Sequence, residues 1–375
     1  MAGLLACCIW TDRAGSDAGV VAGIGGDHKP AGAYEAKVAW DEGTAAVDYG
    51  PGPGAGRLRP GIVMADMLHI DGRLLMAATD GQKIDILEVS DRLRALTGSA
   101  TERDGQILAL RWWRPSPQRP LYLSVVAWLD QNVSATIFSL ENDRLVPVVK
   151  GLDTILGAFD TDGDGLPETL LSQEFDPEAF FGRRIKELYW DGDKLADRSP
   201  AFDLAPRFTV IGGQLADMTG DGKPEAIHVH SGILWISAGK QEIYTSAKQM
   251  GGSLSVLTYK KNPKMKDYIT TSVFFEVAPV AADIDGDGRP EILAVASDQL
   301  PIKAPGLATT IDNSRLMVFK YQDGAFIKGT LGKPVAAALQ GLAFAKGRVW
   351  YVTSETGSLL RPGGPSRLHA LSLRE

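Results

Sequence analysis

Cysteine is almost absent from this sequence, and the two cysteines it has are adjacent. Cys7 and Cys8 are the only ones among 375 residues, so no disulfide framework can brace the chain after them. There is also no run of about 18 to 20 consecutive apolar residues, which a membrane-spanning helix would need. Long helical periodicity is missing as well. Packing and strand pairing must therefore hold the fold, with bound metal as a further candidate.

An excess of positive charge is absent too. Lys and Arg number 39 against 46 Asp and Glu, which gives a formal net charge of -7. Much of the acid lies in three short segments rather than in one tail or run. This balance argues against nucleic acid as a partner and leaves room for bound cations.

Catalytic motifs are lacking in the same way. The sequence contains no serine nucleophile elbow, no glycine-rich phosphate loop and no zinc-ligand spacing. We therefore expect no enzyme. Without a catalytic motif, binding is the favoured kind of function.

What the sequence does contain is one loop that occurs three times. It reads FDTDGDGLPETL at 159–170, ADMTGDGKPEAI at 216–227 and ADIDGDGRPEIL at 282–293. Within nine residues of the first copy, carboxylates stand at positions 1, 3, 5 and 9, with glycine at position 6 where the chain must turn. A hard cation with six to eight oxygen ligands needs such a converging cage, so we predict Ca²⁺ in these loops. Isolated Asp-Gly pairs usually only make turns, but three copies with this spacing favour metal.

The EF-hand begins with the same D-x-D-x-D-G and has to be considered. It requires a bidentate Glu at position 12 and flanking helices. Position 12 is Leu171, His228 and Ala294 in the three copies, and each loop is followed by a strand-like run. The sequence therefore predicts a loop between strands.

From residue 34 onward, short apolar and β-branched runs alternate with polar turns. Two hairpins per unit give four antiparallel strands at a period of roughly 45 to 65 residues, which is typical of a β-propeller blade. We predict an all-β propeller over 34–375, preceded by a separate segment at 1–33. Seven blades are favoured if 254–259 and 268–275 start one of them. Six is the alternative, with Gly251 to Glu276 as an insertion. The hairpin Tyr34 to Val47 would complete the last blade and close the ring.

At the three loops the chain resembles the FG-GAP/VCBS repeat family, the propellers related to the head of integrin α subunits, whose calcium loops follow D-x-D-x-D-G-x-x-D. The resemblance implies one Ca²⁺ in each intact loop between the first two strands of a blade, two to three ions in all. Glu replaces the more usual Asp at position 9, and Thr219 removes a carboxylate from the middle loop, which should be the weakest. The implied ligands, with the residue at position 7 acting through its carbonyl, are Asp160, Asp162, Asp164, Leu166, Glu168, Asp217, Thr219, Asp221, Lys223, Glu225, Asp283, Asp285, Asp287, Arg289 and Glu291.

The start of the chain resembles a bacterial lipobox. Leu4-Leu5-Ala6-Cys7 has the spacing at which the Cys is acylated, although the apolar lead is short and has no basic region before it. We expect lipidation of Cys7, with Thr11 to Ala33 as a flexible tether; the alternative is a short disordered apolar tip. The expected location is extracytoplasmic: the periplasm, the outer membrane or the cell surface.

Two groups of aromatic residues are candidates for binding. The insert 175–184 is expected to expose Phe180 and Phe181 beside Arg183 and Arg184 to a protein partner, or to pack them under its own blade. Trp112, Trp113 and Trp128 either line a sugar groove or fill the space between blades.

The favoured function is a non-enzymatic, Ca²⁺-stabilised scaffold that binds another envelope or extracellular protein or a glycan. The alternative is a polysaccharide hydrolase or lyase.

Overall fold

The computed structural model describes residues 20–21, 58–90, 93–100, 105–246, 249–261, 269–299, 310–356 and 363–373. These residues form strands and their connections, and no helix occurs among them. In this part of the chain nothing is both helical and long and apolar enough to cross a bilayer. The predicted all-β class is confirmed.

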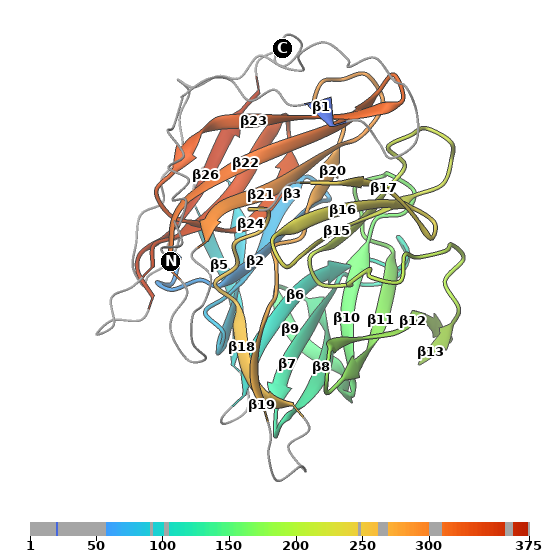
Figure 1. Ribbon diagram of the computed structural model, residues 1–375. Helices are drawn as coiled ribbons and strands as arrows, with labels where there is room; N and C mark the ends of the chain where they lie inside the picture. The colour runs from blue at the N-terminus through green and yellow to red at the C-terminus, as the bar shows by residue number, and fades with distance from the viewer. Residues whose placement is uncertain are drawn as a thin grey trace, which may run out of the picture.

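The strands form seven antiparallel sheets, and six of them are blades, which we number 1 to 6 in chain order (Figure 1). Blade 1 contains β2 (Met64–Ile70), β3 (Arg73–Thr79), β4 (Lys83–Val89) and β5 (Leu93–Ala100). Blade 2 contains β6 (Gln106–Trp113), β7 (Tyr122–Leu129), β8 (Asn132–Glu141) and β9 (Arg144–Leu152). Blade 3 contains β10 (Thr154–Phe159), β11 (Thr169–Asp176), β12 (Phe180–Asp191) and β13 (Lys194–Arg198).

The second half continues in the same order. Blade 4 contains β14 (Gly213–Ala216), β15 (Glu225–His230), β16 (Ile233–Ala238) and β17 (Gln241–Thr245). Blade 5 contains β20 (Val280–Ala282), β21 (Glu291–Gln299), β22 (Ile311–Gln322) and β23 (Ala325–Val335), and β1 (Val20–Val21) pairs with β23 at its edge. Blade 6 contains β24 (Ala338–Ala345), β25 (Arg348–Ser354) and β26 (Ser366–Ser372).

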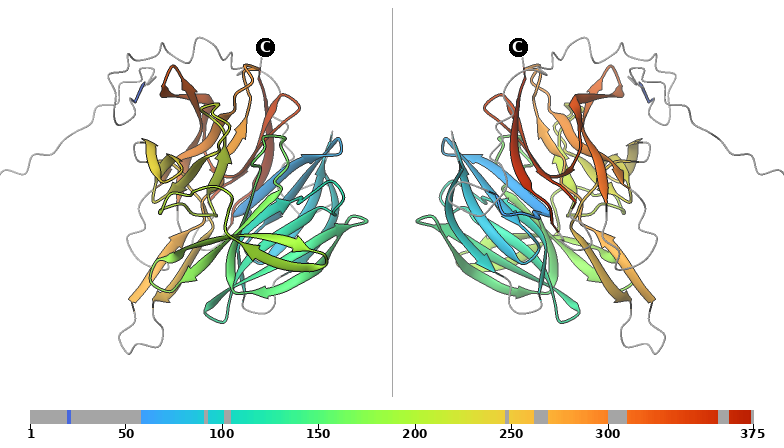
Figure 2. Two further views of the ribbon diagram at one scale, coloured as in Figure 1. Left: turned by 90° about the vertical axis from the view of Figure 1, so that its right-hand side faces the viewer. Right: turned by 90° about the vertical axis from the view of Figure 1, so that its left-hand side faces the viewer.

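The favoured count of seven blades is wrong, and the alternative of six is confirmed. Strands β18 (Val256–Lys261) and β19 (Ile269–Phe274) pair only with each other and form a sheet of two strands. No second hairpin follows them, because the chain continues directly into β20 of blade 5. The segment Gly251 to Glu276 is therefore an insertion between blades 4 and 5 (Figure 2).

Several hairpins are closed by two-residue turns in which both residues have positive φ. Examples are Asp71-Gly72 between β2 and β3 (φ 51° and 74°) and Asp323-Gly324 between β22 and β23 (φ 53° and 82°). Turns of this kind match the right-handed twist of the two strands they join, and Asp, Asn and Gly favour them. The polar breaks in the sequence thus mark the hairpins of the blades.

The core lies between neighbouring blades. Blade 1 packs on blade 2 through residues such as Leu75 and Leu123, and blade 4 packs on blade 5 through residues such as Ile236 and Phe319. Further buried clusters join blades 2 to 4, blades 5 and 6, and blades 6 and 1. Each blade therefore buries both faces against its neighbours, as a ring of sheets requires.

Blades 1 and 6 close the ring through the segment that precedes β2. Ile62 donates its amide to Ser366 Oγ (3.0 Å) and accepts a hydrogen bond from Ser354 Oγ (2.5 Å). The Gly61 amide donates to the Gly364 carbonyl (2.9 Å). These contacts join residues about 300 positions apart.

Two predictions about the N-terminal part fall outside the described residues. They are the closing hairpin at Tyr34 to Val47 and the tether with Cys7 at 1–33, apart from the short strand β1. Both stay predictions.

The connections between the first and second strands of the blades share one face. Arg114, directly after β6, reaches Asp71 in the β2–β3 turn (3.4 Å), and its amide donates to the Pro167 carbonyl in the β10–β11 connection (2.9 Å). In blades 4 and 5, a Cβ at Gly220 would lie 3.6 Å from Arg289 Nε. All three acidic loops are connections of this kind.

The insertion crosses the opposite end of the ring. The Leu254 amide donates to Gln340 Oε1 near the start of β24 (2.9 Å), and Ser255 Oγ donates to the Leu108 carbonyl near the start of β6 (3.0 Å). Both acceptors lie at the beginnings of first strands, whereas the acidic loops follow the ends of such strands. The central channel is therefore bridged at the end away from the acidic loops.

We predict that Gly251→Ala destabilises the protein more than Gly72→Ala does. Both glycines have positive φ (85° and 74°), which costs a residue with a Cβ about 1–2 kcal/mol. A Cβ on Gly251 would also lie 2.5 Å from Glu276 Oε2, while a Cβ on Gly72 would meet nothing within 4 Å. Thermal unfolding of the two variants measures the difference; equal losses would contradict the packing described for the insertion.

Candidate metal-binding loops and the central channel

The three acidic loops have the same backbone conformation. We name them by their first residues as the Asp160 loop (160–168), the Asp217 loop (217–225) and the Asp283 loop (283–291). The glycines at positions 4 and 6 all have positive φ, between 74° and 86°. The first Asp of each loop accepts hydrogen bonds from the amides of these two glycines at 2.7–2.9 Å. The turn is thus folded by its own side chain, as short acidic residues do in other turns.

The Glu at position 9 closes each loop from the other side. Its carboxylate accepts a hydrogen bond from the amide at position 2, at 3.0 Å in the Asp160 loop, 2.8 Å in the Asp217 loop and 2.9 Å in the Asp283 loop. Burial raises the pKa of Glu168 and of Glu225 above the usual range. Each loop therefore has a half-buried or buried acid whose charge needs compensation.

The Asp160 loop brings three carboxylates together. Asp160, Asp162 and Glu168 each offer an oxygen, and these oxygens lie within 4.8 Å of one another. Asp164 accepts a hydrogen bond from the Leu166 amide (2.7 Å), so position 5 is also held in place. An all-oxygen, mainly carboxylate set of this kind fits Ca²⁺.

The Asp217 loop is poorer in acid at its centre. Thr219 stands where the other loops have Asp, and its hydroxyl donates to Glu225 Oε1 (2.9 Å). Within the described ranges, clusters of three metal-type ligands occur in the Asp160 and Asp283 loops, and not in this one. The prediction that the middle loop is the weakest site stays open.

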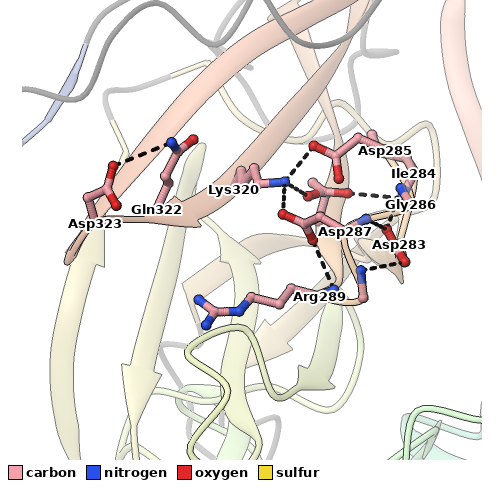
Figure 3. A network of polar contacts seen from close by, with 11 residues as sticks. Asp283, Ile284, Asp285, Gly286, Asp287, Arg289, Lys320, Gln322 and Asp323 are labelled. Carbon is pink, nitrogen blue, oxygen red and sulfur yellow. Dashed lines mark hydrogen bonds and ion pairs between the residues drawn. The ribbon is translucent and has the colours of Figure 1, made fainter. Parts of the chain in front are cut away.

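The Asp283 loop contains a cation of its own. Lys320 Nζ, from β22, lies 2.5 Å from Asp285 Oδ2, 2.5 Å from Asp287 Oδ2 and 2.9 Å from Glu291 Oε1 (Figure 3). Only 4% of the lysine side chain is exposed. Burial lowers the pKa of Lys320, but its hydrogen bonds to Asp285, Asp287 and Glu291 raise this pKa above the usual range. The hydrogen bond from Lys320 in turn lowers the pKa of Asp287. The sequence interpretation did not find this residue.

The Asp160 loop is attached to the neighbouring blade as well as to its own. Trp113 Nε1, at the end of β6, donates to the Glu168 carbonyl (2.9 Å). With the hydrogen bond from the Arg114 amide to Pro167, this fixes the far side of the loop to blade 2. The loop thus joins blades 2 and 3.

The described part of the central channel contains a small cavity. A cavity of about 20 Å³ is lined by residues of several first strands, among them Asp66 and Arg111, and by Glu276 from the end of the insertion. This volume suits about one water molecule. Arg111 Nη1 pairs with Asp66 Oδ1 (3.0 Å), and Glu276 Oε2 accepts the Gly252 amide (2.8 Å). The charged groups of the channel are therefore used within the fold.

The predicted partner site at the insert 175–184 is only partly exposed. Phe180 is fully buried and lies in an aromatic cluster with Trp128, Tyr259 and Phe275. The expectation that Phe180 is exposed is wrong, because the insertion hairpin β18–β19 packs over it. Phe181 is half-buried.

Of the four predicted residues, Arg183 and Arg184 are the exposed ones, and Arg184 pairs with Glu174 (2.6 Å). Trp112, Trp113 and Trp128 are also buried, between the blades rather than along a groove.

The similarities of this chain to known proteins are structural and distant. No protein-family model matches the sequence, and no curated protein matches it. Among solved structures, a provisionally described oxidoreductase (glucose dehydrogenase) of Thermus thermophilus is 15% identical, with a TM-score of 0.44 over 88% of this chain and 100% of that chain. BBS1N in its complex with ARL6DN is 12% identical, with a TM-score of 0.43 over 88% of this chain and 97% of that chain. At these TM-scores neither similarity indicates a function.

A groove lies between blades 2 and 3. It has a volume of about 810 Å³ and is lined by Tyr122 and Val148 from blade 2 and by Trp190 and Leu195 from blade 3. Arg119 lies over the Trp190 ring, 5.6 Å from its centroid. Trp190 was not identified as a binding candidate from the sequence, because the residues that line this groove come from two blades.

We predict that Glu276→Gln stabilises the protein at pH 8 and changes it little at pH 5. Burial raises the pKa of Glu276 to about 7. Between about pH 4.5 and pH 7 the folded state keeps a proton that the unfolded state loses, so wild-type stability falls as the pH rises through this window. The neutral Gln avoids the loss, which amounts to about 3 kcal/mol for a pKa raised from 4.5 to about 7.

Thermal unfolding of the wild type and Glu276→Gln at both pH values measures this effect, with Glu178→Gln, an exposed acid, as the control. A variant that is equally destabilised at both pH values would contradict it.

Proposed function

We propose that this chain is a Ca²⁺-stabilised β-propeller of the FG-GAP/VCBS type that acts as a binding scaffold. The observation that carries the proposal is the Asp160 loop. Three of its carboxylates, those of Asp160, Asp162 and Glu168, offer oxygens within 4.8 Å of one another, between the first two strands of a blade, where the family resemblance expects calcium. Asp160, Asp162, Asp164 and Glu168 would hold the ion, which would supply positive charge to the loop and perform no chemistry.

The small size of the cavity in the channel favours binding at the outer surface over catalysis in the channel. A cavity of about 20 Å³ has no room for a sugar ring, and the insertion bridges one end. Asp66 in this cavity pairs with Arg111. The alternative of a polysaccharide hydrolase or lyase would need acids that converge around an open cleft.

The ligand surface of the scaffold is proposed on the outer side of the ring. The groove between blades 2 and 3 combines aromatic rings with Arg119, Lys194 and Asp197, a mixture suited to protein side chains or sugar hydroxyls. An extracytoplasmic location would provide the millimolar Ca²⁺ that extracellular modules use. Anchoring through Cys7 remains part of the proposal.

Calcium should raise the melting temperature of the wild type. For a dissociation constant of 10⁻⁴ to 10⁻³ M, 5 mM Ca²⁺ adds about 1–2 kcal/mol to the free energy of unfolding, and a chelator removes it. Asp162→Asn should lose most of this gain. Asp191→Asn, an exposed acid outside the loops, should keep it. Melting curves with calcium and with chelator test this; an unchanged melting temperature in the wild type would contradict structural calcium.

The scaffold function is tested by isolation of the native protein from bacterial envelopes. We expect a stoichiometric protein or glycan partner, and weaker capture after Trp190→Ala or Lys194→Glu in the groove. Arg183→Glu, on the exposed side of the insert, separates the groove from that second surface. Glycan cleavage without a partner would instead favour the enzyme.

A further inference from the structure

The ammonium group of Lys320 occupies the position that a metal ion would need in the Asp283 loop. Phe319 pairs with Ile292 across β22 and β21, so the next residue, Lys320, lies beside Glu291 at the start of β21. Its Nζ contacts one oxygen each of Asp285, Asp287 and Glu291 at 2.5–2.9 Å (Figure 3). These are the residues at positions 3, 5 and 9 of the loop.

Ca²⁺ and this ammonium group compete for the same oxygens. A calcium ion has its ligands at about 2.3–2.6 Å, which is nearly the distance at which Nζ lies from two of the carboxylates. Both cations cannot occupy the same small space, because they would overlap and repel each other. The lysine is also tethered by β22 and buried, so its effective concentration at the loop is high.

In the other two loops, the strand position equivalent to Lys320 carries a different residue. Leu188 pairs with Leu170 in blade 3, which places Trp190 beside Glu168. Ser237 pairs with Ala226 in blade 4, which places Ala238 beside Glu225. At the strand position that carries Lys320 in blade 5, the equivalent residues are therefore uncharged. At this position the Asp160 and Asp217 loops have no cation from their own blade.

We infer that the Asp283 loop takes no metal and that Lys320 is its permanent cation. The three loops then form two classes: one closed by a side chain of its own blade and two whose negative charge is open to a divalent cation. The number of ions bound is accordingly smaller than the number of loops. This inference rests on the proposed calcium binding of the loops, but its decisive experiment does not require the Asp160 loop to bind.

The test is the number of calcium ions bound by Lys320→Met and by the wild type. Met keeps the length of the side chain and removes the charge, so the three carboxylates are left without a partner. In calcium-free buffer the variant should melt roughly 5–15 °C below the wild type, as expected when one partner of a buried ion pair is removed. Equilibrium dialysis in calcium should show one more ion per chain in the variant, and part of the melting temperature should return.

Lys186→Met is the matched control. Lys186 also lies 2.5 Å from a carboxylate, that of Asp197, but the pair is about half exposed and lies outside the loops. This variant should bind the same number of ions as the wild type. An equal count in Lys320→Met and the wild type would overturn the inference.

A second variant keeps the test decisive if Lys320→Met does not fold. Asp287 is 43% exposed, so Asp287→Asn is the milder change in the same loop. It should leave the number of bound ions unchanged, whereas a loss of one ion would overturn the inference. Asp162→Asn reports separately on the Asp160 loop: if the wild type binds no calcium and Lys320→Met gains one ion, the proposed function fails and the inference holds.

Discussion

The acidic loops can form only if the repulsion among their carboxylates, which are confined to nine-residue turns, is offset. Two unit charges 4 Å apart interact by about 1 kcal/mol in bulk water and by about 4 kcal/mol at the effective dielectric constant of a protein surface. The loops meet part of this cost themselves, since backbone amides donate to the carboxylates at positions 1 and 9. Amides orient the acids without neutralising them. A full positive charge would neutralise them, and in blade 5 Lys320 provides one.

The source of that charge decides what each loop does for the fold. In blade 5, Lys320 joins the third strand to the connection between the first and second, so the blade is held together by its own residues. In blade 3, the Asp160 loop is fixed to blade 2 through Trp113 and faces solvent with its acids. A metal bound there would stabilise the contact between two blades. Calcium sensitivity should therefore concentrate at one side of the ring.

Sequence patterns predicted the features that arise from local chemistry. Period-two alternation and the polar two-residue turns indicated antiparallel hairpins, and the repeated loop marked the connection between the first two strands of three blades. They overestimated the number of blades, because β18 and β19 alternate like a blade hairpin although they bridge the ring. Phe180 was expected at the surface for a similar reason: the hairpin that covers it lies some 80 residues further along the chain.

The missed features all depend on residues that are distant in sequence. Lys320 follows a run of apolar strand residues, and nothing in the neighbouring sequence indicates that it pairs with the carboxylates of the Asp283 loop. Its place beside Glu291 is set by the register between β21 and β22, which the sequence does not reveal. Glu276 looks like an ordinary acid until the insertion is seen to bring it against Gly251 and Gly252 in the channel. Charge compensation in this propeller is thus a property of its strand pairing.

Anomalous diffraction from crystals grown in calcium would locate each ion and Lys320 in one experiment. We expect a calcium peak within the carboxylates of the Asp160 loop, a weaker peak or none in the Asp217 loop, and Lys320 Nζ among the carboxylates of the Asp283 loop. A calcium peak in the Asp283 loop with Lys320 displaced, or no peak in the Asp160 loop, would contradict this expectation.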